Sequence, residues 1–252
     1  MMLVRTLFVI LLAQSAAAVG DGSANYIQAA VESPLRIEQD FDRDKTRHPA
    51  EVLAFVGIQP GMAVLDLFSG GGYYTILISA IVGPQGSVTA HNNAAYLPYA
   101  GEELEQRKAR GIPANVESLI SEANDLQLPD AHYDAVMAVL TWHDFYYVDP
   151  DNGWPAIDAD GMVDRLCRTL KPGGVLAVVD HAAQSGSEVR ATAQNLHRID
   201  PARVRSDLDN ECFEFVGESD VLRNPGDNHE LPMFNEKVQG KTDRFVYLFR
   251  RE

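Results

Sequence analysis

Histidine and aspartate side chains follow two apolar runs of this chain, close to the point where each run ends. His143 and Asp144 come shortly after the run Tyr133–Leu140, and His181 directly follows the run Val175–Asp180. A histidine titrates near neutral pH, so it can take a proton from a reacting group, and a neighbouring carboxylate can orient its ring. A lone histidine more often has a packing role, but several on one rim favour function. We therefore predict His143, Asp144 and His181 as catalytic residues.

A run of three glycines follows the apolar run Met62–Leu67 and precedes a helical stretch. The segment reads Asp66-Leu67-Phe68-Ser69-Gly70-Gly71-Gly72-Tyr73. Glycines allow a ligand to approach the backbone closely, and the N-terminus of the next helix adds a partial positive charge. A tight strand-to-helix turn without a ligand is the alternative, but three consecutive glycines exceed its needs. A dinucleotide site is disfavoured because its third glycine would fall at Thr75 and its acid belongs about 20 residues downstream.

Apolar runs that alternate with helical stretches predict a doubly wound α/β fold with a mostly parallel sheet. The predicted strands are Met62–Leu67, Ser87–Ala90, Asn115–Ile120, Tyr133–Leu140, Val175–Asp180, Phe213–Val216 and Phe245–Phe249. The predicted helices are Pro49–Val56, Tyr74–Val82, Glu102–Arg110, Ala159–Leu170 and, less sharply bounded, Pro201–Asn210. A long loop, Arg223–Thr242, separates the last two strands, which should form an antiparallel hairpin at the sheet edge. Ligands bind beyond the carboxyl ends of such strands, where the glycine turn and the histidines meet.

The acid that precedes the glycines resembles motif I of class I S-adenosylmethionine-dependent methyltransferases. That motif reads acid-x-Gly-x-Gly-x-Gly; Asp66, Gly70 and Gly72 match it, and Phe68 replaces the first glycine. Three other stretches are similar to the same family: Pro60-Gly61, Tyr133-Asp134-Ala135-Val136 and the predicted turn Leu170-Lys171-Pro172-Gly173-Gly174. The whole layout resembles a group of bacterial proteins known only as predicted methyltransferases with a signal peptide. The resemblance implies a seven-stranded, Rossmann-like sheet.

The resemblance also implies S-adenosylmethionine as the cofactor and an unidentified small molecule as the methyl acceptor. The glycine turn would hold the methionine portion of the cofactor, and Asp66 would bind its amino group. Glu122 and Ala123 stand where the family contacts adenine. Asn92 stands where the family has an acid for the ribose hydroxyls, and a neutral amide is a weaker acceptor than a carboxylate. The implied cofactor contacts are Asp66, Phe68, Ser69, Gly70, Gly71, Gly72, Tyr73, Asn92, Glu122 and Ala123.

Asp144 and Asp180 resemble in position the acids that hold magnesium in some small-molecule O-methyltransferases. Carboxylates suit such hard cations, whereas the nearby histidines suit zinc or iron. No ligand-spacing signature accompanies these residues, so we predict no metal site. A metal-dependent enzyme that uses this His/Asp rim stays an alternative.

Aromatic and basic residues near the rim each have two interpretations. Trp142, Tyr146 and Tyr147 either form a wall suited to a sulfonium or an aromatic substrate, or pack in the core. Three basic residues before the first predicted helix either fold over the site as a lid or form a solvated charged turn: Arg43, Arg47 and His48.

The first 18 residues resemble an export signal. Met1–Ala18 combines an early Arg5, a short apolar run and a small-residue cleavage site, and its apolar run is too short for a membrane anchor. We predict a signal peptide, a single domain over residues 19–252, and a periplasmic or secreted protein without stable membrane insertion. Because the cofactor is made in the cytoplasm, an exported binding protein of this fold that has lost catalysis is the second hypothesis.

Charge and cysteine content narrow the possible partners. The 252 residues include 21 lysines and arginines and 36 acidic residues, which gives a formal charge of −15. No basic cluster offers the phosphate contacts of a nucleic-acid binder, so we expect no nucleic-acid partner. Cys167 and Cys212 are compatible with one disulfide or with two buried thiols. The sequence does not indicate an oligomeric state.

Overall fold

A computed structural model of the protein describes residues 21–252. The predicted signal peptide, Met1–Ala18, lies outside the described residues, so export stays a prediction. Within the described range, no helix combines the length and the apolar character that a membrane span requires.

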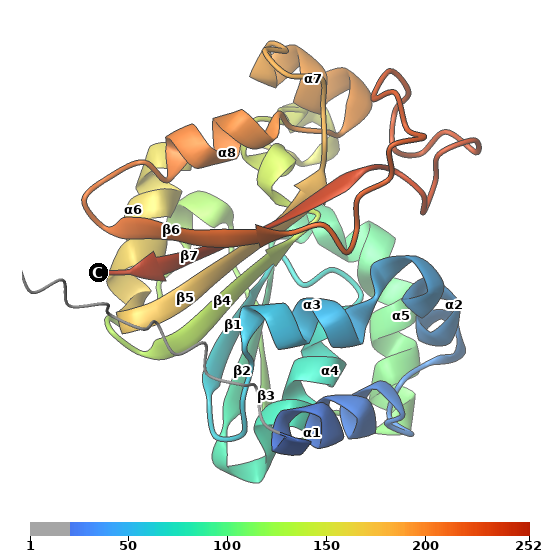
Figure 1. The fold of residues 1–252 in the computed structure, drawn as a ribbon, viewed down its shortest axis with the longest axis vertical. Coiled ribbons are helices and arrows are strands. Elements are labelled where there is room, and N and C mark those ends of the chain that lie inside the picture. The colour runs from blue at the N-terminus through green and yellow to red at the C-terminus, as the bar shows by residue number, and fades with distance from the viewer. Residues whose placement is uncertain (1–20) are drawn as a thin grey trace, which may run out of the picture.

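Seven strands form one mixed sheet, in the order β3-β2-β1-β4-β5-β7-β6 (Figure 1). They are β1 (Ala63–Leu67), β2 (Ser87–Asn92), β3 (Val116–Ile120), β4 (Tyr133–Val139), β5 (Leu170–His181), β6 (Phe213–Ser219) and β7 (Arg244–Arg251). The first five strands run parallel, and β7 pairs antiparallel with both β5 and β6. The predicted doubly wound, mostly parallel α/β fold with an antiparallel C-terminal pair is confirmed.

The order of the last two strands differs from a simple hairpin added to the edge. The final strand, β7, lies inside the sheet, and β6 forms the edge. Six successive residues of β7 are buried, as expected for a strand covered on both faces, whereas after the buried Phe213 exposed and partly buried residues alternate in β6. A second difference concerns Lys171–Gly174, which was predicted as a turn. These residues belong to β5, which begins at Leu170 and shifts its register against β4.

Eight α-helices and five short 3-10 turns accompany the strands in residues 21–252. The α-helices are α1 (Asp21–Val31), α2 (Glu38–Arg47), α3 (Pro49–Val56), α4 (Tyr73–Val82), α5 (Leu97–Arg110), α6 (Ala159–Thr169), α7 (Val189–Leu196) and α8 (Pro201–Asp207). The 3-10 turns are η1 (Gly83–Gln85), η2 (Ala94–Tyr96), η3 (Ala123–Asp125), η4 (Trp142–Phe145) and η5 (Pro150–Asn152). Helices α1, α2 and α7 were not expected from the sequence.

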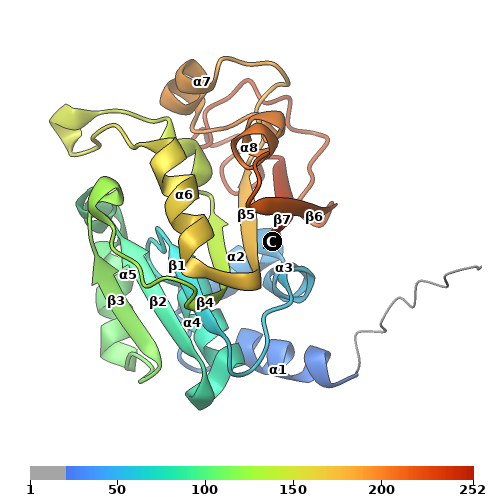
Figure 2. The ribbon, with the colours of Figure 1, turned by 90° about the vertical axis from the view of Figure 1, so that its left-hand side faces the viewer.

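The sheet separates two apolar cores, and neighbouring residues of one strand contribute to opposite cores. In β1, Val64 faces the core that contains α1, α3 and α4, whereas Leu65 faces the core that contains α6, α7 and α8. In β5, Ala177 and Leu176 divide in the same way. This period of two residues places helices on both faces of the sheet (Figure 2).

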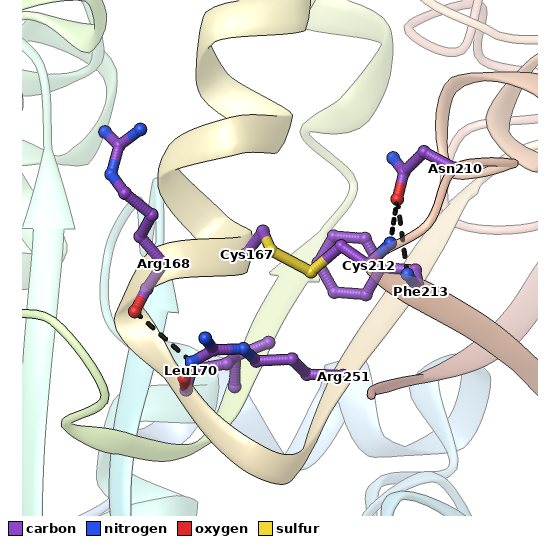
Figure 3. Close-up of a disulfide and its surroundings, with 7 residues drawn as sticks. All are labelled: Cys167, Arg168, Leu170, Asn210, Cys212, Phe213 and Arg251. Carbon is purple, nitrogen blue, oxygen red and sulfur yellow. Dashed lines mark hydrogen bonds between the residues drawn. A yellow bond between two sulfur atoms is a disulfide. The ribbon is translucent and has the colours of Figure 1, made fainter.

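A disulfide joins Cys167 near the end of α6 to Cys212 just before β6, with a Cα–Cα distance of 6.2 Å (Figure 3). Asn210 supports the segment that carries Cys212, because its side-chain oxygen accepts the backbone N–H groups of Cys212 and Phe213 at 2.9 and 3.2 Å. Of the two possibilities left open by the sequence, the structure has the paired cysteines. The bond ties α6 to the edge of the sheet.

Candidate functional site

The glycine turn connects the carboxyl end of β1 to the first turn of α4. Gly70 and Gly72 have positive φ angles of 56° and 81°, and Gly72 is the N-cap of α4. Glycine adopts this backbone region without steric penalty. Phe68 also has a positive φ, 51°, which is uncommon for a bulky residue and often marks a functional loop.

The side chain of Asn92, at the end of β2, braces this turn. Its oxygen accepts the N–H of Gly70 at 2.8 Å, and its nitrogen donates to the Gly70 carbonyl at 3.0 Å and to the Ser69 hydroxyl at 3.1 Å. All the hydrogen bonds of this amide therefore go to the turn itself. A contact between Asn92 and ribose hydroxyls stays a prediction, and it would require an exchange of these bonds.

Asp66 lies beneath the turn as a buried carboxylate. The Thr75 hydroxyl of α4 donates to it at 2.6 Å. Burial raises the pKa of Asp66 to about 6, although the hydrogen bonds from Thr75 oppose the shift. Asp66 thus holds the first turn of α4 against β1, and it shares its region of the protein with the cationic side chains of Arg47 and Arg107.

Helices α2 and α5 close over the other side of the turn. Arg107 of α5 donates to the Gly71 carbonyl at 2.5 Å and makes a double hydrogen bond to the fully buried Asp40 of α2, at 2.7 and 2.8 Å. Arg43 of α2 pairs with Glu103 of α5, which lies so close to Gly71 that a Cβ there would be 2.3 Å from its carboxylate. The basic segment is therefore a packed helix and not a solvated turn.

Arg47, at the end of α2, is a basic residue whose charge has no carboxylate partner among the described residues. Its guanidinium lies over the ring of Tyr73, 4.6 Å from the centroid, and makes no ion pair with any residue in the range 21–252. Burial lowers its pKa. Arg244, at the start of β7, also lacks a carboxylate partner among the described residues; burial and the charge of Arg47 lower its pKa to about 10. His48 is exposed and lies outside this arrangement.

The predicted adenine-contacting residues follow β3. The Oε1 atom of Glu122 accepts the N–H of Ala94 at 3.2 Å, but its Oε2 is buried without a hydrogen-bond partner among the described residues. Ala123 is buried. Nearby, the ring of Phe68 stacks on Tyr96 with a centroid distance of 5.2 Å and an angle of 8°. Burial of a carboxylate oxygen without a hydrogen bond is energetically unfavourable, so we expect this atom to accept a hydrogen bond from a bound molecule.

A cavity of about 310 Å³ opens beside the end of β4. Five aromatic side chains line it: Tyr96, Tyr99, Tyr147, Trp154 and Phe234. Three polar side chains, His143, Asp144 and His197, lie on the same wall. Of the predicted aromatic wall, Tyr147 belongs to this cavity, whereas Trp142 and Tyr146 pack in the core and donate to Asp207 at 3.0 and 2.7 Å.

His143 lies between two carboxylates in this wall. Its Nδ1 is 2.8 Å from Asp180 Oδ1, and its Nε2 is 3.3 Å from Asp144 Oδ1. Burial alone would lower the pKa of His143, but the charges of Asp144 and Asp180 outweigh it and raise the pKa to about 9. The two carboxylates therefore favour the positively charged imidazolium form of His143, in which both ring nitrogens carry a proton. Two acids and not one flank the imidazole, and the role of His143 as a catalytic base stays a prediction.

Asp180 orients His143 but does not reach the cavity. It is fully buried, and besides the ring it accepts the backbone N–H groups of His143 and His181 at 2.8 and 2.7 Å. The oxygens of Asp180 are engaged by three donors, so of the two acids that resemble a magnesium pair in position only Asp144 is placed to meet a bound ion. Asp144 does face the cavity, and Tyr96 donates its hydroxyl to Oδ2.

His181 lies behind His143, with 6.0 Å between the ring centroids, and does not line the cavity. Its Nδ1 is 2.6 Å from the Thr242 hydroxyl, and its Nε2 is buried without a partner among the described residues. Burial and the charges of neighbouring cations lower its pKa well below the usual value. A catalytic role for His181 stays a prediction, and its position is suited to supporting the His143 wall.

Three residues that line the cavity were not predicted as site residues from the sequence: His197, Trp154 and Tyr96. His197 follows α7 with a left-handed backbone, φ 48°. The residues next to His197 in the sequence do not indicate that it lines a cavity. Helix α7, which His197 follows, was itself not predicted.

The chain is similar to known proteins both in sequence and in fold. Residues 58–237 match a family described as "Methyltransferase domain". The chain is 30% identical over 167 residues to the ubiquinone/menaquinone biosynthesis C-methyltransferase UbiE of Shewanella woodyi, which covers 65% of this chain and 61% of that protein. A similar protein from Shewanella piezotolerans is 34% identical over 125 residues, which cover 49% of this chain and 44% of its own length. The chain thus spans less than two thirds of the length of these curated relatives.

Two solved structures are similar in fold. A S-adenosylmethionine-dependent methyltransferase from Aquifex aeolicus is 22% identical with a TM-score of 0.56, over 90% of this chain and 97% of that one. The [4+2]-cyclase SpnF is 15% identical with a TM-score of 0.57, over 90% of this chain and 92% of that one. At these identities the likeness concerns the fold alone.

Proposed function

The chain belongs to the S-adenosylmethionine-dependent methyltransferases, and on that premise we propose that it methylates a small, largely aromatic or apolar molecule bound in the cavity beside β4. S-adenosylmethionine is the cofactor of this family, and its sulfonium supplies the methyl group. The observation that carries the proposal is the glycine turn at the end of β1, which is open at Gly70 and close to Arg47, a cation without a carboxylate partner among residues 21–252.

The methionine end of the cofactor fits the glycine turn. A Cβ added at Gly70 would meet no atom within 4 Å, so there is open space beside the turn. The guanidinium of Arg47 is nearby and has no carboxylate partner in residues 21–252, and a partly buried charge of this kind is unfavourable until it is paired. Arg47 would bind the carboxylate of the cofactor, and Arg244 would add to the positive potential.

Two residues are expected near the adenosyl end of the cofactor: Glu122 fits a contact with adenine, whereas Asn92 departs from the acid that the family has for the ribose. The Oε2 atom of Glu122, which is buried without a partner in the described part of the chain, would accept a hydrogen bond from the amino group of adenine. Asn92 is bonded to the turn instead of being free for the ribose. We expect the ribose to be held less tightly than in relatives with an acid at this position.

The cavity supports the acceptor half of the proposal. Methyl transfer is an in-line displacement, so placing the two reactants accounts for most of the acceleration. The aromatic side chains around the cavity would hold an apolar acceptor and exclude water. Asp180 fixes the His143 ring, and Tyr96 fixes Asp144, so the polar wall is preorganised to orient the acceptor.

Gly70 offers a matched pair of variants that tests the site. Gly70→Asn and Gly70→Asp have nearly the same shape, and both residue types tolerate positive φ better than most, but only aspartate adds a charge. We expect S-adenosylmethionine binding, measured by calorimetry, to weaken at least about ten-fold more in Gly70→Asp than in Gly70→Asn, because of repulsion from the ligand carboxylate. Gly71 is unsuitable, since any side chain there collides with Glu103.

Two results would contradict the proposal. Equal affinities of the two Gly70 variants would place the methionine carboxylate elsewhere. No binding by the unmodified protein at millimolar cofactor would exclude a functional cofactor site.

The second hypothesis, an exported binding protein without transferase activity, is favoured by Asn92, whose amide is occupied by the turn. Incubation of the protein and cofactor with a fractionated small-molecule extract separates the two. Formation of S-adenosylhomocysteine, followed by mass spectrometry, supports the enzyme, whereas binding without any turnover across all fractions supports the binding protein.

Export of the chain is supported by the Cys167–Cys212 disulfide, because disulfides persist mainly in oxidising compartments. We expect expressed full-length protein to be recovered outside the cytoplasm with its N-terminal segment removed and no alkylatable thiol. Cytoplasmic recovery of an intact chain with two free thiols would refute export.

A further inference from the structure

We propose that His143, Asp144 and His197 form a binding site for a divalent metal ion of the zinc class, in the wall of the aromatic cavity. One ligand atom from each of the three side chains lies within 4.8 Å of the others. Two imidazoles and one carboxylate are a common donor set for catalytic zinc and for non-haem iron(II). The site does not depend on the glycine turn or on S-adenosylmethionine.

The orientation of His143 is that of a metal ligand supported by a second carboxylate. Asp180 engages its Nδ1 at 2.8 Å and Nε2 is directed toward Asp144, so a bound ion would take the place of the proton on Nε2. Metal-bound histidines almost always donate their other ring nitrogen to a carboxylate, a carbonyl or a water in this way. Asp180 is fully buried and has three donors, so it positions His143 without binding the ion itself.

Asp144 is arranged in a corresponding way. The hydroxyl of Tyr96 donates to its Oδ2, and its Oδ1 lies 3.3 Å from His143 Nε2. Two ligands of a tetrahedral zinc ion, each about 2.0–2.1 Å from the metal, are about 3.3–3.5 Å apart. The separation of these two atoms already corresponds to one edge of such a tetrahedron.

His197 completes the set from a different part of the chain. Its ring is held by aromatic contacts, with centroids 5.6 Å from His143 and 4.7 Å from Tyr147, and makes no side-chain hydrogen bond to any described residue. A half-buried imidazole without a hydrogen bond at the wall of a cavity is free to coordinate. Since its ligand atom lies within 4.8 Å of the other two, a shift of at most about 1.4 Å would bring it to the separation of ligands on a tetrahedral ion.

The chemistry of the donors selects the kind of ion. Imidazole nitrogen suits zinc and iron(II), whereas magnesium prefers oxygen ligands in an octahedron. Three protein ligands leave at least one coordination position open, and the three side chains line the cavity together. The open position would take a water or an oxygen, nitrogen or sulfur atom of a molecule bound among the aromatic side chains.

Metal titration of the protein, purified without a histidine tag and dialysed against a chelator, tests the proposal. We expect one equivalent of Zn²⁺ to bind by calorimetry, and one equivalent of Co²⁺ to give visible absorption bands that Zn²⁺ removes. His197→Ala should weaken Zn²⁺ binding at least ten-fold, since one ligand is lost. Asp180→Asn should weaken it by roughly 10–100-fold through the His143 ring.

His132→Ala is the matched control, because His132 is exposed next to β4 but precedes the strand, at its opposite end. It should bind Zn²⁺ like the unmodified protein, and circular dichroism should show that each variant is folded. The proposal is overturned if the unmodified protein binds no stoichiometric Zn²⁺, if His197→Ala binds as tightly as His132→Ala, or if Mg²⁺ binds more tightly than Zn²⁺.

Discussion

The Cys167–Cys212 disulfide gives a stability prediction whose magnitude follows from the fold. Replacing both cysteines by alanine, or reducing the bond, frees a loop whose ends are 45 residues apart in sequence. Loop-closure entropy for that length corresponds to about 4 kcal/mol of unfolding free energy at 25 °C. The loop contains β5, α7 and α8, so the whole C-terminal half of the sheet should become easier to unfold.

Urea unfolding followed by circular dichroism measures this effect in three samples: the oxidised protein, the protein with a reducing agent, and Cys167→Ala/Cys212→Ala. The last two should agree, with an unfolding free energy lowered by about 4 kcal/mol and a Tm lowered by roughly 8–16 °C for a chain of this size. Both cysteines are only partly buried, so the loss of side-chain packing should add little.

The reducing agent should have no effect on the double variant, which serves as the control. The reasoning is refuted if the oxidised protein contains two free thiols by titration, or if reduction leaves its urea midpoint unchanged.

Two further predictions concern charged groups around the glycine turn. Asp66 has a folded pKa of about 6 against 3.8 when unfolded, so its contribution to stability is present below pH 4 and is lost as the pH rises to 6, by about 3 kcal/mol. Asp66→Asn should remove this dependence in urea unfolding at pH 4–7, and parallel curves for the two proteins would contradict it. Arg47→Gln should weaken S-adenosylmethionine binding roughly 10–100-fold by calorimetry, the effect of a lost hydrogen bond to a charged group, whereas Lys45→Gln on the exposed side of α2 should not. Equal affinities of these two variants would remove Arg47 from the cofactor site.

The sheet and the glycine turn could be predicted because they depend on residues close together in the chain. Apolar runs such as Tyr133–Leu140 form a buried strand wherever helices cover both faces, and Gly70 and Gly72 supply backbone angles that a strand-to-helix turn requires. The acid before the glycines then indicated the family.

The order of β6 and β7 could not be read from the sequence, because either strand of an antiparallel pair can lie inside. Burial of β7 on both faces decides it. Helix α2 was missed for a related reason. Its sequence is strongly polar, and it is stabilised by contacts to distant residues, such as the ion pair between Asp40 and Arg107.

The sequence by itself determined the class of fold, the place of the glycine turn and the rim where His143 and Asp144 would lie. Only the tertiary structure decided how those side chains are used. Asp180 comes 37 residues after His143 and became its buried partner instead of a ligand, and His197 was brought to the same wall from the end of α7. The glycine turn and the apolar strands depend mainly on neighbours in the chain, whereas distances between side chains depend on how whole elements pack. The polar wall of the cavity therefore depends on how the elements that carry His143, Asp180 and His197 pack together.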